Sequence, residues 1–82
     1  MVSIGVFYSK NKSPWQKLPD ISAFLSEKQL IPNVGDRVTA IGDDHRVMGI
    51  PPDDFANCLT VKEKVFRYSS YDIALVCDYV PF

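Results

Sequence analysis

Cysteine, histidine and long apolar runs are scarce in this sequence of 82 residues, which contains two cysteines and one histidine. Two cysteines do not make the disulfide framework of a small secreted protein, and with one histidine they leave a four-ligand zinc site incomplete. Cys58 and Cys77 are therefore expected to be reduced, small apolar side chains. The longest apolar run, Ile73–Cys77, is far shorter than the roughly 18 residues that a membrane span needs. The sequence thus argues against a disulfide scaffold and against a membrane-spanning helix.

A surplus of positive charge is also missing, because ten acidic residues face nine basic ones and the net charge is −1. Domains that grip a phosphate backbone are usually basic throughout. The charge is uneven, however, since residues 1–19 carry three lysines and no acid. Residues 1–10 lack the basic start and apolar core of a secretory signal. We therefore expect a cytoplasmic protein that does not associate with membranes.

Recognisable catalytic groups are absent as well. The one cluster that suggests metal or acid–base chemistry is Asp43-Asp44-His45, and its place between two apparent strands predicts a solvated hairpin turn. There is no Gly-x-Ser-x-Gly elbow and no glycine-rich phosphate loop, and a single histidine is available as a base. We expect a non-enzyme with no catalytic residue, no metal ligand and no cofactor.

The apolar and charged fractions, 46% and 23%, are those of an ordinary globular chain, and 82 residues suffice for one small domain, residues 1–82. Asp20 is a candidate N-cap for a short helix near residues 20–29, which Pro32 prevents from continuing far. Alternation of apolar and polar residues predicts strands at residues 2–8, 37–41, 46–50, 59–68 and 71–80.

The segment Leu30–Val47 predicts a proline-led Gly-Asp turn and then a hairpin with its loop at residues 42–45. The adjacent apolar residues Val65 and Phe66 suggest a β-bulge in the longest strand. About five antiparallel strands with tight turns and one helix indicate a mainly β (α+β) domain. The expected architecture is a half-open SH3-like barrel or curled meander.

The residues that look most suited to partner binding form a loop with the single tryptophan. Lys10, Lys12, Trp15 and Lys17 lie in a segment rich in proline, serine and asparagine. Trp15 either folds back to plug the end of the barrel or anchors a protein partner, since tryptophan is enriched in interface hot spots. Lysines beside an aromatic ring can also bind single-stranded nucleic acid by stacking.

A second group of aromatic residues occupies the C-terminal hairpin. Tyr68 and Tyr71 flank its turn, where they can pair across the strands or supply a rigid recognition surface. Tyr79, Val80 and Phe82 place apolar groups near one end of the last strand. If this strand lies at an edge of the sheet, it favours a homodimer interface through these three residues.

Two segments, IPNVGDRV (residues 31–38) and VKEKVFRYSSYDIALVCDYVP (residues 61–81), resemble small uncharacterised proteins of phages, plasmids and integron cassettes. Those proteins open a β-meander with a Pro-x-Val-Gly-Asp turn and close with an aromatic-rich hairpin. The resemblance implies a stand-alone accessory protein that works by binding, with inhibition of a host factor as one role that this would allow. It assigns no site residue.

From these observations we expect a non-enzymatic protein-binding accessory module that modulates a host factor. Its partner surface is predicted to comprise Trp15, the three nearby lysines and the two tyrosines of the hairpin. The alternative is a small nucleic-acid-binding β-barrel that uses the loop from Lys10 to Lys17. The two classes differ in salt dependence, because contacts to phosphate weaken steeply as salt rises.

Overall fold

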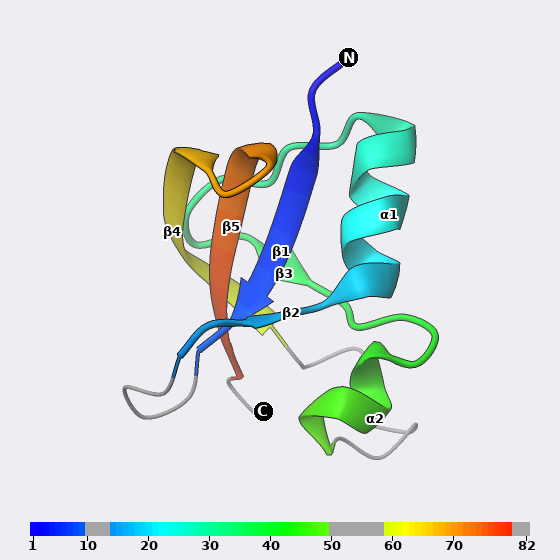
Figure 1. Cartoon of the computed structure of the whole chain (residues 1–82). Helices are drawn as coiled ribbons and strands as arrows, with labels where there is room; N and C mark the ends of the chain where they lie inside the picture. The colour runs from blue at the N-terminus through cyan, green and yellow to red at the C-terminus, as the bar shows by residue number, and fades with distance from the viewer. Residues whose placement is uncertain (10–13, 50–58, 80–82) are drawn as a thin grey trace.

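Over the residues that the structure describes, the chain forms a mixed five-stranded sheet that curls into a half-barrel with two helices (Figure 1). The computed structural model describes residues 1–9, 14–49 and 59–79. Its elements are β1 (Ile4–Tyr8), β2 (Gln16–Lys17), α1 (Pro19–Lys28), β3 (Arg37–Val38), α2 (Asp44–Met48), β4 (Leu59–Tyr68) and β5 (Tyr71–Tyr79). The predicted mainly β fold with a short helix is therefore confirmed. Neither helix is long and apolar enough to cross a membrane.

The strands are arranged in the order β2-β1-β5-β4-β3, so the last strand is the central one. β5 is antiparallel to β4 but parallel to β1, with Ile4 opposite Ile73 and Tyr8 opposite Cys77. The expectation of antiparallel pairing throughout is wrong for this one pair. The condition under which β5 would favour a homodimer, a place at an edge of the sheet, is not met, because β1 and β4 of the same chain flank it.

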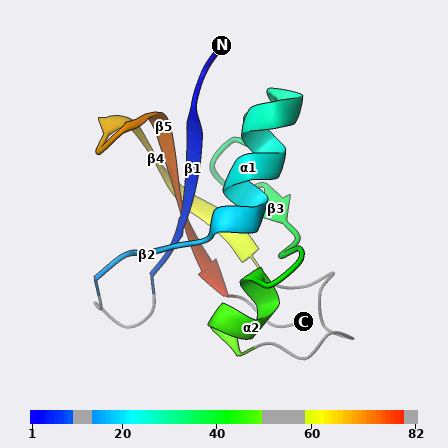
Figure 2. The ribbon, with the colours of Figure 1, turned by 45° about the vertical axis from the view of Figure 1, so that its right-hand side comes forward.

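The main core lies between α1 and one face of the sheet (Figure 2). Alternate residues of β1 and β5 point toward the helix, as the two-residue period of a strand requires. The buried side chains that meet there include Ile4, Val6, Tyr8, Leu18, Ile21, Leu25, Leu59, Val61, Leu75 and Cys77. Each fully buried aliphatic side chain contributes about 1.5–3 kcal/mol to the free energy of unfolding, before the loss of conformational entropy is counted. Helix and sheet therefore hold each other in place.

Helix α1 begins one residue earlier than predicted, and its N-terminus is capped from elsewhere in the chain. The N-cap position is Leu18, whose side chain has no acceptor, so the prediction that Asp20 caps the helix is wrong. The carboxylate of Asp44 accepts hydrogen bonds from the backbone N–H groups of Asp20 (3.2 Å) and Ile21 (2.7 Å) instead. A carboxylate is favourable there because the first N–H groups of a helix lack partners and the helix dipole is positive.

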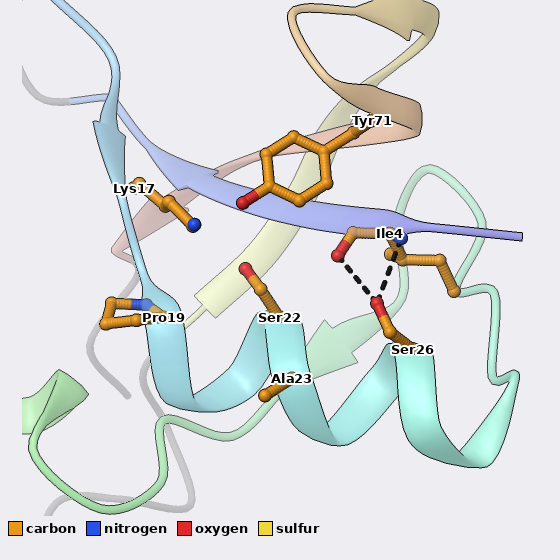
Figure 3. Close-up of a pocket in the computed structure, with 7 residues that line it drawn as sticks. All are labelled: Ile4, Lys17, Pro19, Ser22, Ala23, Ser26 and Tyr71. Atoms are coloured by element: carbon orange, nitrogen blue, oxygen red, sulfur yellow. Dashed lines mark hydrogen bonds between the residues drawn. The ribbon is translucent and has the colours of Figure 1, made fainter.

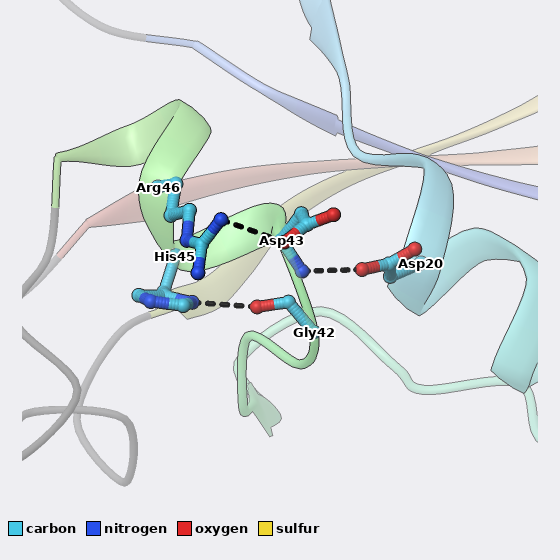
Figure 4. Close-up of polar contacts among 5 residues, drawn as sticks. All are labelled: Asp20, Gly42, Asp43, His45 and Arg46. Atoms are coloured by element: carbon cyan, nitrogen blue, oxygen red, sulfur yellow. Dashed lines mark hydrogen bonds and ion pairs between the residues drawn. The ribbon is translucent and has the colours of Figure 1, made fainter.

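The predicted hairpin at residues 37–50 is wrong. Only Arg37 and Val38 pair as a strand, and Asp44–Met48 form helix α2, which Gly49 ends in a left-handed conformation. Asp44 is 0% exposed, so the prediction of a solvated turn is wrong for this residue. The reciprocal contact explains the change, because the backbone N–H of Asp43 donates to the carboxylate of Asp20 (Figure 4). Two helix ends thereby satisfy each other in a way that a hairpin would not allow.

Strand β4 spans the predicted residues 59–68, but its irregularity lies earlier than expected. The register with β5 shifts between Val61 and Glu63, not at Val65 and Phe66. An extra residue in one strand reverses which side chains face the core. Val61 is consequently part of the core, whereas Val65 lies opposite Ala74 on the other face of the sheet.

Polar side chains of α1 close the side of β1 that β2 leaves open. The hydroxyl of Ser22 accepts the N–H of Val6 (2.7 Å), and the hydroxyl of Ser26 accepts the N–H of Ile4 (3.0 Å) and donates to its carbonyl (3.0 Å). Gln29 likewise accepts from the N–H of Val2 and donates to its carbonyl. The two serines of α1 and Gln29, the residue that caps its C-terminus, supply the hydrogen bonds that a neighbouring strand would otherwise make.

Candidate functional site

Four aromatic rings meet on the face of the sheet opposite α1. The ring of Phe7 lies 6.2 Å from Trp15, 5.3 Å from Tyr68 and 5.8 Å from Tyr71, measured between centroids. The rings of Trp15 and Tyr68 are 5.0 Å apart. The contacts of Phe7 with the two tyrosines are edge-to-face, the geometry that the ring quadrupoles favour. We call these four residues the aromatic cluster.

The aromatic cluster is assembled by four strands, β1, β2, β4 and β5. Alternation along β1 sends Phe7 to the opposite face from Val6 and Tyr8. The short strand β2 pairs Lys17 with Phe7 and so brings Trp15, two residues earlier, alongside. At the other end, Tyr68 and Tyr71 are register partners at the close of the β4–β5 hairpin. Residues from distant parts of the sequence are thus held on one rigid sheet surface.

The ring of Tyr71 packs against β1 at Gly5. A Cβ atom at Gly5 would lie 2.6 Å from Cδ2 and 2.7 Å from Cγ of Tyr71. These are ring atoms near the base of the side chain, so a small rotation of the phenol would not clear them. Gly5 therefore permits the ring of Tyr71 to lie directly against the backbone of β1.

Lys17 adds a positive charge at the margin of the aromatic cluster. Its Nζ atom lies 5.1 Å from the centroid of the Tyr71 ring, within the range of a cation–π interaction. Lys17 and Tyr71 also form one wall of a pocket of about 160 Å³ whose opposite wall is α1, including Ser22 and Ser26 (Figure 3). The pocket is large enough for a small side chain of a partner and has a cation at its mouth.

The aromatic cluster is partly open to solvent. Phe7 is buried beneath it, Trp15 and Tyr71 are half-buried, and Tyr68 is 37% exposed. Trp15 does not belong to the core between α1 and the sheet. A half-exposed group of rings beside a lysine can bury an apolar side chain and attract an acidic group at the same time.

The structure brings together four of the six predicted partner-binding residues, namely Trp15, Lys17, Tyr68 and Tyr71. The other two, Lys10 and Lys12, lie outside the described residues. Sequence reasoning missed Phe7 and Gly5 as parts of the site. The signal was available, because alternation along residues 2–8 already places both on the face opposite Ile4 and Val6.

Of the predicted dimer-interface residues, Tyr79 is half-buried and packs against the core, where it is the register partner of Leu59. Val80 and Phe82 lie outside the described residues. The apolar residues on the second face of β5, Ala74 and Val76, are buried within the chain. These two residues therefore do not require a second copy of the chain to cover them. Self-association stays a prediction.

The titratable groups whose pKa values are raised lie away from the aromatic cluster. Burial raises the pKa of the Cys77 thiol to about 12, with a smaller contribution from Asp78. Burial also raises the pKa of Tyr8, and Asp78 and Tyr79 add to it. Within residues 1–9, 14–49 and 59–79, no three His, Cys, Asp or Glu side chains gather as a metal site would require. At the aromatic cluster, the described side chains offer aromatic contact and the positive charge of Lys17.

Comparison of the chain with protein-family models, with curated proteins and with solved structures gave no match. The role of the candidate site is therefore inferred from its geometry.

Proposed function

We propose that the protein is a non-enzymatic protein-binding module whose partner surface is the aromatic cluster with Lys17. The observation that supports this most directly is the meeting of Trp15, Tyr68 and Tyr71 around Phe7 with part of each ring surface left open. Tryptophan and tyrosine dominate the hot spots of protein interfaces because they bury much apolar area with few rotatable bonds.

The pocket beside the cluster suggests the kind of partner. Its volume of about 160 Å³ accommodates a small side chain, and Lys17 at its margin favours a neighbouring carboxylate. The partner is expected to be a host-cell protein whose activity the module modulates, as the resemblance to accessory proteins of mobile elements implies.

The proposal is tested by affinity capture from a lysate of the source cell with tagged wild-type protein and the Trp15→Ala and Tyr68→Ala variants. A matched control is Phe24→Ala, since Phe24 is an exposed aromatic residue on α1, away from the cluster. A hot-spot truncation costs about 2 kcal/mol or more, which corresponds to a roughly 30-fold weaker complex.

A protein recovered by the wild type and by Phe24→Ala, but lost with Trp15→Ala and Tyr68→Ala, is the expected result. Recovery of the same proteins by all four forms would refute a role for the cluster. Near-UV circular dichroism and thermal melts of each variant separate a loss of binding from a loss of fold.

A nucleic-acid-binding function is the second candidate, because a base can stack on Trp15 while Lys17 approaches the backbone. Fluorescence of the single tryptophan reports this directly in a titration with oligothymidine. Quenching that weakens steeply between low and high salt would favour this alternative over the protein-binding proposal. Unchanged fluorescence would count against it.

A further inference from the structure

The backbone groups on the outer edges of β1 and β4 are hydrogen-bonded to different extents. On one side, Ser22, Ser26 and Gln29 occupy the open positions of β1. On the other side, β3 pairs only with Leu59 and Thr60 of β4. Gly35 and Asp36 extend this contact to Val61 by two backbone hydrogen bonds. Beyond that point, no strand among the described residues pairs with the outer side of β4, residues 62–68 (Figures 1 and 2).

The hydrogen bonds of β5 identify which backbone groups of β4 point outward. Ile73 donates its N–H to the carbonyl of Ser3, and the carbonyl of Cys77 accepts from the N–H of Ser9, each at 3.1 Å. Both Ile73 and Cys77 therefore present their backbone to β1. Alternation along the strand turns the backbone of Ala74 toward β4.

Ala74 pairs with Val65 of β4. The backbone groups of Val65 are consequently directed to β5, and those of its two neighbours, Lys64 and Phe66, are directed away from the sheet. An outward-facing N–H and C=O at two alternate residues form the template to which a further strand can add.

Charge argues against a second copy of the chain as that strand. Residues 62–68 contain three basic residues, Lys62, Lys64 and Arg67, and one acidic residue. Lys62 is paired with Asp78 within the chain. Two copies of β4 side by side would bring together two segments that each have two more basic than acidic residues, and this repulsion opposes their pairing. An acidic segment would instead be attracted to Lys64 and Arg67.

Apolar groups border the same side of β4. Phe66 is 68% exposed, and Val34 is 60% exposed. Val34 is held near the strand because its neighbours contact β4, Asn33 through Lys64 Nζ (2.9 Å) and Gly35 through the carbonyl of Val61 (2.8 Å). A strand added here would cover Phe66 with one side chain while another met Lys64 two residues along the same face.

We propose that the outer side of β4 at residues 62–68 binds an extended acidic segment of a partner protein by strand addition. Lys64 and Phe66 supply the backbone hydrogen bonds. The segment carries an acidic and an apolar residue two positions apart, so that both side chains lie on the face of Lys64 and Phe66. The surface shares Tyr68 with the aromatic cluster, but Lys64 and Phe66 are not members of the cluster. One chain can therefore hold two partners or two parts of the same partner.

The test is an NMR titration of the 15N-labelled protein with a capped peptide of roughly ten residues. In this Glu-Val peptide, Glu and Val take turns at every second position and Thr fills the positions between them, so that both lie on one face of the strand. Binding is expected to shift the amide signals of Lys64 and Phe66 and to slow their hydrogen exchange at least tenfold. The same peptide with Lys in place of Glu, the Lys-Val peptide, is the charge control. No binding of the Glu-Val peptide at millimolar concentration, or binding without slowed exchange at these two amides, overturns the proposal.

Two variants at one position separate the backbone from the side chain. Phe66→Pro removes an outward N–H without removing a bond to β5, and is expected to abolish binding, whereas Phe66→Ala keeps the N–H and is expected to weaken it less. If Phe66→Pro does not fold, a Glu-Val peptide with alternate amides N-methylated serves instead, because it cannot pair along a strand. Equal binding of the methylated and unmethylated peptides contradicts the proposal.

The charge requirement is tested with Lys64→Glu combined with Arg67→Glu, which is expected to bind the Glu-Val peptide at least tenfold more weakly and the Lys-Val peptide more tightly. Unchanged preference would overturn the acidic character of the partner. Trp15→Ala is expected to bind the Glu-Val peptide as the wild type does, so failure here and failure of the proposed cluster function remain distinguishable.

Discussion

The hydroxyl group of Ser26 makes two hydrogen bonds with one residue, accepting the N–H of Ile4 and donating to its carbonyl, each at 3.0 Å. A helix residue thus occupies the place that a residue of an adjacent strand would take beside β1. With Ser22 and Gln29 it forms a row along α1 at a spacing of four and three residues, which puts all three on one helix face.

Replacing Ser22 by alanine is expected to lower the free energy of unfolding by about 1–3 kcal/mol, because the N–H of Val6 becomes a buried donor without an acceptor. Urea denaturation followed by circular dichroism measures the change. Ala23→Ser on the exposed side of the same helix is the control, with an expected change within about 0.5 kcal/mol. Equal effects of the two substitutions would show that the hydroxyl is not needed at position 22.

Removing both hydroxyls, by Ser22→Ala with Ser26→Ala, opens part of the backbone of β1. An exposed strand edge promotes pairing between chains. The double variant is expected to form larger species at concentrations where the wild type does not, as measured by light scattering. A variant that is destabilised but stays at the wild-type mass would contradict the idea that the serines protect this edge.

Substitution of Asp44 by alanine is expected to destabilise the protein by about 1–3 kcal/mol, because two N–H groups of the first turn of α1 lose their acceptor. Asp44→Asn keeps one side-chain oxygen and is expected to cost less. Thermal melts of the three forms at one pH measure the difference. An Asp44→Ala variant that melts at the same temperature as the wild type would mean that solvent accepts the hydrogen bonds of the helix terminus equally well.

The same carboxyl gives stability a pH dependence with a defined sign. Burial raises the pKa of Asp44, against the opposing hydrogen bonds from Ile21 and Asp20. The folded state therefore binds this proton more tightly than the unfolded state does. The stabilisation that comes from protonated Asp44 is fully present below the ordinary aspartate pKa. It is lost as the pH rises through the raised pKa of the folded state. Comparison of urea midpoints of wild type and Asp44→Asn from about pH 3 to 7 isolates it. A wild-type midpoint that rises relative to the variant over this range would contradict the direction.

Gly5→Ala is expected to displace the ring of Tyr71 and to lower stability by about 1–3 kcal/mol, because the new methyl group would overlap the ring. A double-mutant cycle with Tyr71→Ala tests the cause, since the cost of Gly5→Ala should fall once the ring is absent. Near-UV circular dichroism reports the loss of aromatic packing. An unchanged cost in the Tyr71→Ala background would assign the effect to the backbone of β1.

The Cys77 thiol is expected to resist modification in the folded protein. A pKa of about 12 leaves roughly one thiol in ten thousand ionised at pH 8, and the side chain is buried in the central strand. Reaction of a Cys58→Ser variant with Ellman's reagent reports Cys77 alone. Slow reaction in buffer and fast reaction in denaturant are expected. Rapid reaction in buffer would show that the core opens around β5.

The sequence predicted the longest elements because their patterns are strong. Alternation and the two-serine turn predicted strands at residues 59–68 and 71–80, and β4 and β5 are observed at Leu59–Tyr68 and Tyr71–Tyr79. The helix near residues 20–29 was predicted from Pro32 and a short apolar stripe. Strand β2 has only two residues, too few to show a period. Helix α2 was missed because Asp44 is satisfied by the N-terminus of α1, a contact between residues 24 positions apart.

The partner surface was predicted in part for a similar reason. Tyr68 and Tyr71 are close in the sequence, so their association could be inferred from the hairpin turn. Phe7 and Trp15 lie beside the two tyrosines only because β1 pairs with β5 in parallel. Local patterns do not determine such a pairing, because it joins segments whose order in the sheet differs from their order in the chain.

That parallel pairing also sets when the protein can acquire its structure during synthesis. Ser3 and Asp72, which bond through both backbone and side chain, are 69 residues apart. The apolar residues of β1 and α1 therefore stay largely exposed to solvent until β5 has left the ribosome and can pack against them. Contacts between such distant segments close slowly. Chaperones that bind exposed apolar chain thus have their longest opportunity before the central strand arrives, and translation that stalls ahead of β5 leaves a product unable to complete its core.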